Sequence, residues 1–504
     1  MASDKFGRDE WVAQIDARRA APTGVMGQLL ARWNALPLGW RWLGVLAAFA
    51  AIPFLTSNDY LIRVAGTVCL FATLSLGLNV VVGYAGLLDL GFVAFYGLGA
   101  YAYALLSSGK FDLHWPSWVT LLFIGVLGLA FGVLLGLPSL RLLGDYLAIV
   151  TLGFGLVFVQ LAITMDRVEV PWHAGPIDVT GGSNGLINLD PLRLFGLDFG
   201  EPLTLFGYAL SSVALYFYAL LAALAVVLLV IYHLNQSRIG RAWRAMREDS
   251  LAAEAMGMPT KRLKLLAFAC GSAIAGVSGG IFAAWQHSVF PLNFSTDLLI
   301  TLYAMMVLGG LGSLPGVVIG AGILAVIPEL LRSPELARVA FYGAVVLGVA
   351  LFLRPRRNGL IVLAGVILLG LILRLATQTL WPDLLSPPTI TVAAESVSTA
   401  FERTAQTFGI IVQKWIILPM EPTPPGNVAF LVLLPALLAW ARLQPSRLKL
   451  GLLAPLLYLL AFVWETRLTA EPAVTRLLLI GTLLVVLMIF RPHGLLGTKR
   501  VELV

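Results

Sequence analysis

The stretch "SRIGRAWRAMREDSLAAEAMGMPTKRLK" spans residues 237–264 and separates two long apolar runs, at 206–232 and 263–284. Seven basic residues fall between Arg238 and Lys264, and three acids lie among them. Runs of about 20 apolar residues are long enough to cross a bilayer core. The stretch therefore predicts a charged loop between two membrane-spanning helices, and it indicates a polytopic helical membrane protein.

The composition of the whole chain agrees with this class. Of its 504 residues, 59% are hydrophobic and 12% are charged, whereas a soluble domain carries about 25% charged residues. Two of the apolar runs, 298–311 and 427–440, are short enough to be re-entrant or broken helices. We expect an all-α polytopic membrane protein with about 11–14 transmembrane or broken helices, drawn from the runs 41–56, 60–82, 84–106, 118–137, 145–163, 206–232, 263–284, 298–311, 313–331, 337–353, 359–380, 427–440, 450–466 and 475–490.

Basic residues in the short loops predict which loops face the cytoplasm. Segments 237–264, 354–359, 442–449 and 491–500 are basic, and cytoplasmic loops carry an excess of Lys and Arg. Counting spans outward from these loops gives a consistent alternation. It places both termini in the cytoplasm and leaves 164–205, with six acids against two arginines, and the Pro-rich 381–426 on the outer side.

The charged loop has a pattern of its own. An arginine stripe occupies one helical face, and Trp243 and Met246 share another; the stripe is Arg238, Arg241, Arg244 and Arg247. Asp249 or Ser250 can cap a second short helix, "LAAEAM", which Gly257 ends in left-handed geometry. Two interpretations remain open: the loop anchors the chain to anionic lipid, or it presents a compact helix to a groove of a cytosolic partner.

The glycine-rich stretch 79–106, "NVVVGYAGLLDLGFVAFYGLGAYAYALL", predicts a broken helix. Glycines weaken a helix, and transporters tolerate such breaks where the backbone lines a cavity. An acid at membrane depth is a functional candidate, although Asp89 can instead be a structural acid that caps a broken helix. The predicted translocation-path or gating residues are Asn79, Gly83, Tyr84, Gly86, Asp89 and Gly91.

Small residues at helical spacing predict close helix packing. They recur on one face at Gly312, Gly316 and Gly320, and again at Gly276 and Gly280. Such spacing lets helix backbones approach closely in lipid. The contact can lie within this chain or against a second subunit.

Catalytic motifs are missing from the sequence. There is no Gly-x4-Gly-Lys-Ser/Thr phosphate-binding loop and no His-Glu-x-x-His, no nucleophile elbow lies inside an apolar run, and the five histidines are scattered. We therefore expect no catalytic residue, no metal site and no cofactor bound by this chain.

The quoted motifs resemble one family of transporters. "GRAWRAMREDSLAAEAMGMPTKRLKLLAFACGSAIAGVSGGIFA" (240–283) is similar to the coupling-loop region of branched-chain amino acid ABC transporter permeases of the LivM type. "GYAGLLDLGFVAFYGLGAYAYALL" (83–106), "VTGGSNGL" (179–186), "LGGLGSLPGVVIGAGIL" (308–324) and "FRPHGLLG" (490–497) also resemble that family. The likeness covers roughly residues 60–353 and the tail. Asp89 lies where many relatives carry Ser, and the block 361–473 departs from the shorter family pattern.

The resemblance implies a site and a domain organisation. It assigns the coupling loop to 235–262, and its ATPase-coupling residues are Arg241, Arg244, Arg247, Glu248, Ala253, Glu254, Ala255 and Gly257. It divides the chain into a cytoplasmic segment 1–38, a type II-like ABC importer permease core 39–353, additional spans 354–474 with the external loop 381–426, and a final span and tail 475–504.

The resemblance also implies partners and a mechanism. A LivH-type permease, two cytosolic LivG/LivF-type ATPases that bind ATP and Mg, and a periplasmic amino acid binding protein would complete an importer in the bacterial inner membrane. Two other classes stay open from the residues alone. An ion-coupled secondary transporter would need intramembrane carboxylates, of which Asp89 is one candidate, and a membrane-embedded transferase would need a polar catalytic cluster.

Overall fold

The computed structural model describes residues 38–470 apart from 57, 109, 140–144, 170–175, 195, 206–207, 331–333, 354–355, 381–399, 420 and 444–446, together with residues 481 and 494–496. Nearly all of the predicted N-terminal segment, the predicted span 475–490 and most of the C-terminal tail lie outside the described residues. So does the first part of the predicted external loop 381–426.

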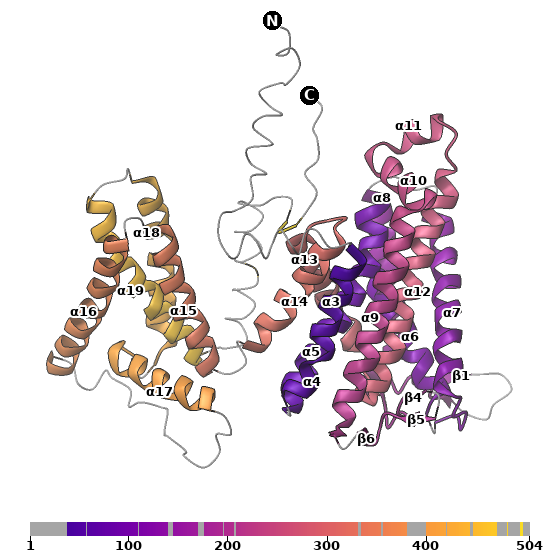
Figure 1. Ribbon diagram of the computed structural model, residues 1–504, viewed down its shortest axis with the longest axis horizontal. Helices are drawn as coiled ribbons and strands as arrows, with labels where there is room; N and C mark the ends of the chain where they lie inside the picture. Colours follow the sequence, from indigo (N-terminus) through magenta and orange to yellow (C-terminus); the bar gives the residue numbers. More distant parts are fainter. Residues whose placement is uncertain are drawn as a thin grey trace, which may run out of the picture.

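The residues up to 330 form a first group of packed helices (Figure 1). It consists of α3 (Leu38–Ala50), α4 (Ile52–Leu55), α5 (Asp59–Asn79), the π-helix η1 (Val80–Tyr84), α6 (Phe92–Leu106), α7 (Ser117–Ser139), α8 (Asp145–Thr164), α9 (Ser212–Gln236), α10 (Arg238–Glu248), α11 (Ser250–Ala255), α12 (Thr260–Gln286), the 3₁₀ turn η3 (Pro291–Phe294), α13 (Thr296–Gly309) and α14 (Leu314–Leu330).

Within the described residues, nine helices are long and apolar enough to cross a membrane, and four further apolar helices are shorter. The predicted segment 84–106 is interrupted as its glycines indicate, because η1 ends at Tyr84 and α6 begins at Phe92. The predicted short run 427–440 belongs to a longer helix, α18 (Thr423–Arg442), which is of membrane-spanning length. Sequence hydropathy underestimated α18 because proline residues and Thr423 form its first turn.

Close helix contacts build the centre of the first group. A Cβ on Gly99 of α6 would lie 2.0 Å from the carbonyl oxygen of Gly276 on α12, and one on Gly280 would meet Ile124 of α7. A Cβ on Gly320 of α14 would lie 2.1 Å from the carbonyl oxygen of Met305 on α13. Gly276 and Gly280, and likewise Gly316 and Gly320, therefore lie at helix contacts inside this chain, where close approach replaces the hydrophobic drive that lipid does not supply. Gly312 was predicted on the same helical face as Gly316, but it has φ +79° and lies in the turn before α14 begins.

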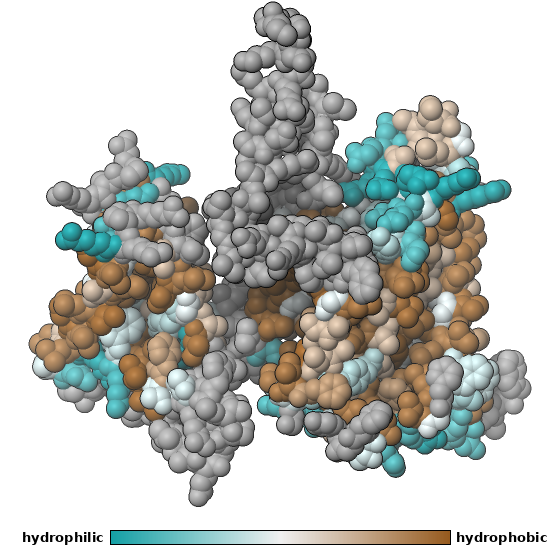
Figure 2. Space-filling view, viewed as in Figure 1, coloured by the Kyte–Doolittle hydropathy of each residue, from teal (hydrophilic) through white to brown (hydrophobic). Residues whose placement is uncertain are grey.

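The two polar ends of the first group lie opposite one another, as the alternation of spans predicts (Figure 1). Helices α10 and α11 form one end, and short strands gather at the other. An apolar band separates the two hydrophilic ends on the face that Figure 2 shows. The strands are β1 (Val168–Glu169), β2 (Pro176–Ile177), β3 (Leu186–Ile187), β4 (Arg193–Leu194), β5 (Leu197–Asp198), β6 (Leu203–Leu205), β7 (Tyr208–Leu210) and β8 (Ser288–Val289); they pair as β1–β2, β3–β8, β4–β5 and β6–β7, with the 3₁₀ turn η2 (Gly182–Asn184) before β3.

A second group of helices follows α14. It contains α15 (Pro334–Phe352), α16 (Arg356–Leu380), α17 (Ala400–Trp415), α18 and α19 (Arg447–Ala470). Phe341 of α15 stacks on Trp464 of α19 with ring centroids 4.5 Å apart. Helix α17 was not predicted, because its apolar and polar residues alternate around an amphipathic helix rather than forming an apolar run.

Candidate functional site

Helix α10 rests on the first group through its apolar face. The Ser237 hydroxyl accepts hydrogen bonds from the backbone N–H groups of Ile239 and Gly240, which caps the helix. Trp243 and Met246 are buried, and the Trp243 indole Nε1 donates to the carbonyl oxygen of Leu263, 2.9 Å away, at the start of α12. The loop is thus held in place by specific contacts to the helices on both of its sides.

Two arginines of the stripe are tied to the end of α9. Arg241 Nη1 donates to the carbonyl oxygen of Gln236 at 2.9 Å, and Arg244 Nη2 donates to that of Asn235 at 3.3 Å. The last carbonyls of a helix have no partner within it, and basic side chains can satisfy them. These arginines therefore fasten α10 to α9.

Helix α11 is capped at both ends. The Asp249 carboxylate accepts from the N–H groups of Leu251 and Ala252, at 2.9 and 3.0 Å. At the other end Gly257 has φ +80°, a conformation that a side chain disfavours, and the Met258 N–H donates back to the carbonyl of Ala253. The Asp249 cap and the left-handed conformation of Gly257 are both as the sequence pattern predicts.

The predicted coupling residues divide by orientation. Ala253 is buried against the rest of the chain, whereas Glu248, Ala255 and Gly257 are exposed. Glu254 is also exposed, and its Oε2 accepts a hydrogen bond from the Thr260 hydroxyl at 3.3 Å. The predicted coupling residues of this segment therefore include both buried and exposed positions.

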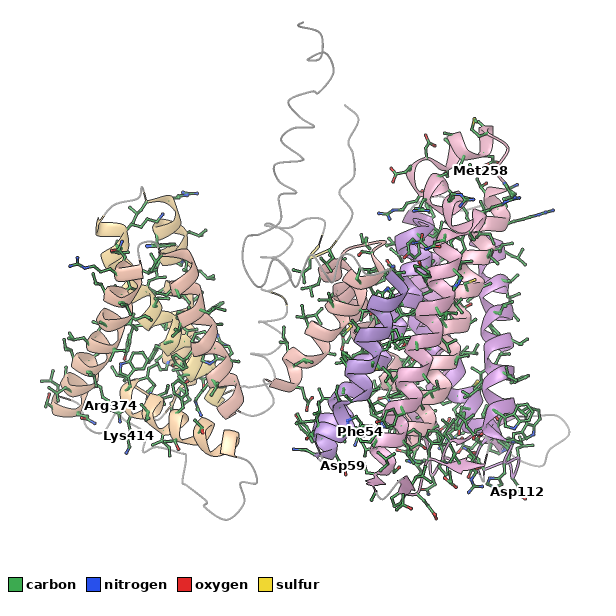
Figure 3. The ribbon with its side chains drawn as sticks, in the orientation of Figure 1. Phe54, Asp59, Asp112, Met258, Arg374 and Lys414 are labelled. Carbon is green, nitrogen blue, oxygen red and sulfur yellow. The ribbon has the colours of Figure 1, made fainter. Side chains whose placement is uncertain are left out.

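Sequence reasoning missed two exposed apolar side chains, one in the first turn of α11 and one directly after the helix. Leu251 is 77% exposed and Met256 is 81% exposed, at the end of the molecule where the neighbouring Met258 is labelled in Figure 3. At this polar end of the molecule, the two exposed side chains are available for apolar contact with a partner protein. The available signal was their position on either side of "AAEA" in a loop that is otherwise polar.

Arg247 extends inward from α10. Its Nη1 donates to the carbonyl oxygen of Gly83 in η1. The side chain fits only because Gly86 and Gly312 lack a Cβ: one at Gly86 would lie 2.8 Å from Arg247 Cγ, and one at Gly312 would lie 2.9 Å from Arg247 Nη1. Arg247 thus connects the loop directly to the break between α5 and α6.

Asn79 lies at the same break between α5 and α6, inside the helix bundle. Its side chain is fully buried, and its Oδ1 accepts from the Gly312 N–H at 2.9 Å. The π-helical turn after it, which ends at Tyr84, is also buried. Single π-helical turns are frequent at functional sites. Asn79, Gly83 and Gly312 therefore bring the α5–α6 break and the α13–α14 turn together beneath Arg247.

Asp89 lies in the irregular segment that leads into α6. Its Oδ1 accepts from the Gly91 N–H at 2.9 Å, and its backbone carbonyl accepts from the Tyr303 hydroxyl of α13 at 2.7 Å. Leu90 N–H donates to the Thr151 hydroxyl of α8 at 2.9 Å. Through these contacts, the segment around the buried Asp89 stabilises the turn of the chain that leads into α6.

The opposite end carries a polar hollow of about 830 Å³. Trp115, Trp118, His114 and Arg193 line it, together with Asp190. His114 Nδ1 pairs with Asp190 Oδ2 at 2.5 Å, and the hydrogen bond to that carboxylate raises the pKa of His114. Among the residues that the structure describes, no group of three or more His, Cys, Asp or Glu side chains could hold a metal ion.

Together, the bundle and its loop define a class: a polytopic helical membrane protein that presents a capped helix at one polar end and ties it to a broken helix. The family described as "Branched-chain amino acid transport system / permease component" matches residues 60–350. The chain therefore belongs to this family of permease components.

Individual relatives show the same family. The high-affinity branched-chain amino acid transport system permease protein LivM of Escherichia coli is 39% identical over 303 residues, which cover 58% of this chain and 68% of that protein. A probable LivM permease of Methanocaldococcus jannaschii is 25% identical over 42% of this chain and 55% of its own length. LivH of Escherichia coli is 36% identical over 23% of this chain and 36% of its own. No solved structure matches the chain.

Proposed function

We propose that this chain is the transmembrane permease subunit of an ATP-driven importer for branched-chain amino acids. It forms the translocation path with a LivH-type permease and carries no catalytic residue. ATP and Mg are bound by two LivG/LivF-type ATPases, and a periplasmic binding protein delivers the substrate. The likeness to LivM and, over a shorter stretch, to LivH supports the pairing of two permeases.

The observation that carries the proposal is a pair of exposed apolar side chains at α11. Leu251 in its first turn and Met256 directly after it are exposed, and Asp249 and Gly257 fix the shape of this segment. An apolar pair on a rigid helix suits insertion into a groove of a soluble partner. This arrangement favours an ATPase-docking helix over a simple lipid anchor, which would need only the arginines.

The contacts between the docking loop and the helix bundle transmit the movement of the docked helix to the translocation path. Closure of the ATPase dimer moves α11 and α10, and Arg247 carries that movement to Gly83 at the break between α5 and α6. A ligand shifts a conformational equilibrium only through different contacts in the two states. We therefore assign Asn79, Gly83, Tyr84, Gly86, Asp89 and Gly91 to the gate that opens outward.

The proposed placement follows from the same assignment. Loop 235–262 faces the cytoplasm together with both termini, and the hollow near His114 faces the periplasm, where the binding protein docks. The membrane is the bacterial inner membrane. Residues 39–353 form the permease core, and residues 354–474 are additional spans.

The test is reconstitution of the complete importer in proteoliposomes with docking-face variants. We expect Leu251→Asp/Met256→Asp to release the ATPases during copurification and to abolish uptake, while the chain still inserts. Glu254→Arg and Gly257→Val should leave ATP hydrolysis uncoupled from uptake. The matched control is Leu496→Asp, an exposed apolar residue on the same proposed side of the membrane but outside the loop. Unchanged copurification and uptake in the double variant would remove this assignment.

A further inference from the structure

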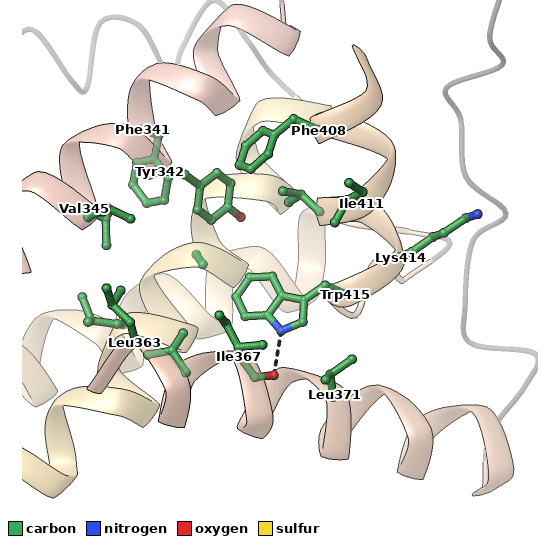
Figure 4. A pocket seen from close by; sticks show the side chains of 15 residues that line it. Phe341, Tyr342, Val345, Leu363, Ile367, Leu371, Phe408, Ile411, Lys414 and Trp415 are labelled. Atoms are coloured by element: carbon green, nitrogen blue, oxygen red, sulfur yellow. Dashed lines mark hydrogen bonds between the residues drawn. The ribbon is translucent and has the colours of Figure 1, made fainter. Parts of the chain in front are cut away.

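A hollow of about 560 Å³ opens within the second group of helices, outside the proposed docking loop and gate. Its walls come from α15, α16, α17 and α19, and they include Phe341, Val346, Ile367 and Ile411 (Figure 4). Its volume lies in the range of small-molecule sites. The family match ends at residue 350, so most of this hollow lies in helices beyond it.

The rim of the hollow has the features of a membrane–water interface. Trp415 lies there, and its indole Nε1 donates to the carbonyl oxygen of Ile367 at 3.0 Å (Figure 4). Lys414, the basic residue in the last turn of α17, extends away from the apolar wall. Tryptophan and lysine are both favoured at the level of lipid headgroups, where lysine projects its ammonium outward.

A second cation lies close to this rim. Arg374 of α16 donates through Nη1 to the carbonyl oxygen of Ile416, 3.1 Å away, directly after α17. Lys414 and Arg374 are labelled at the same end of the second group in Figure 3. The arrangement is therefore an apolar hollow with positive charge at its mouth.

We propose that this hollow holds one acyl chain of an anionic phospholipid, whose phosphate pairs with Lys414 at the rim. An ammonium group at the membrane surface attracts a lipid phosphate through its opposite charge. A branched-chain amino acid fits poorly, because at least one of its two charged groups would face apolar walls. The second group is thus an anionic-lipid receptor attached to the permease.

Native mass spectrometry of the full chain, released from nanodiscs of matched phosphatidylglycerol or phosphatidylcholine, tests the proposal. Wild type should retain phosphatidylglycerol over phosphatidylcholine. Lys414→Gln should reduce retained phosphatidylglycerol about fivefold, as expected for one surface lysine. Ile411→Trp, and independently Val346→Trp, should remove the retained lipid by filling the hollow.

Matched controls use residues outside the hollow. Leu368→Trp adds the same bulk on an exposed face of α16, and Arg442→Gln removes a cation at the end of α18. Both controls should retain lipid as wild type does. The proposal is overturned if the tryptophan variants retain lipid normally, if the two lipids are retained equally, or if filling the hollow instead displaces a second copy of the chain or a bound polypeptide.

Discussion

Arg247 is the residue through which the docking loop reaches the α5–α6 break. Arg247→Gln removes the charged donor to the Gly83 carbonyl, and hydrogen bonds to charged groups are worth about 1.5–3 kcal/mol. If that bond is made in one transport state, uptake should fall about tenfold or more. ATP hydrolysis by the reconstituted importer should persist, because α11 stays docked. Uptake and hydrolysis are measured on the same proteoliposomes.

The control at this scale is Arg238→Gln. Arg238 belongs to the same stripe, but it is exposed at the start of α10 and is not one of the predicted coupling residues. It should keep uptake and hydrolysis coupled. An equal loss of uptake in both variants would mean that the stripe acts through its charge alone, and the specific part given to Arg247 would be wrong.

Residue-level contacts separate into those that sequence can predict and those that it cannot. The cap at Asp249 and the left-handed Gly257 depend on neighbours within three or four positions, so a local pattern suffices. The bond from Arg247 to Gly83 joins residues 164 positions apart, and no periodicity encodes it. The exposure of Leu251 and Met256 likewise depends on which face α11 turns toward the bundle.

Helices α13 and α14 pack through glycines that leave no room for a side chain. A Cβ at Gly320 would lie 2.1 Å from the Met305 carbonyl oxygen, a backbone atom that cannot rotate away. Gly320→Val should force the two helices apart and lower the free energy of unfolding by at least about 1–3 kcal/mol, the usual cost of overpacking. The measurement is the thermal unfolding midpoint of the detergent-purified chain.

Gly153→Val on α8 is the matched control, since a Cβ there has no heavy atom within 4 Å. Its unfolding midpoint should stay at the wild-type value. If Gly320→Val unfolds at the wild-type midpoint and only weakens association with the second permease, the small-residue face serves the other subunit.

At the element scale, sequence predicted most spans because each is an uninterrupted apolar run. The break in 79–106 was also predicted, because its glycines and polar residues conflict with a continuous helix. Helix α17 was missed because an amphipathic helix contains no uninterrupted apolar run. Its apolar side chains line the hollow in the second group, which the sequence does not reveal. The packing partners of each span follow from tertiary contacts that hydropathy does not contain.

On the scale of the whole molecule, the helices form two groups with separate cores. The family match ends inside α15, and this helix packs through Phe341 on Trp464 of α19. Ile327 of α14 also packs against the cluster around Trp464. Helix α15 is therefore both the last helix of the family pattern and the helix against which the additional spans assemble.

The core of the second group contains a buried ion pair whose two residues both belong to this group. Weakening the pair should therefore lower the stability of the second group without affecting the first group. Arg338 Nε donates to Glu465 Oε2 at 2.9 Å, with both side chains almost fully buried. Glu465→Gln leaves the buried guanidinium without its counter-charge, which typically costs about 3–5 kcal/mol. We expect faster proteolysis of residues 356–470 in the folded chain, while uptake is unchanged because the docking loop and the break lie in the first group.

The control variant Arg338→Met/Glu465→Leu, which removes both charges, should regain resistance to the protease. If uptake falls in step with proteolysis, or if the double variant is cut as fast as the single one, the two groups depend on each other for folding and their separation fails.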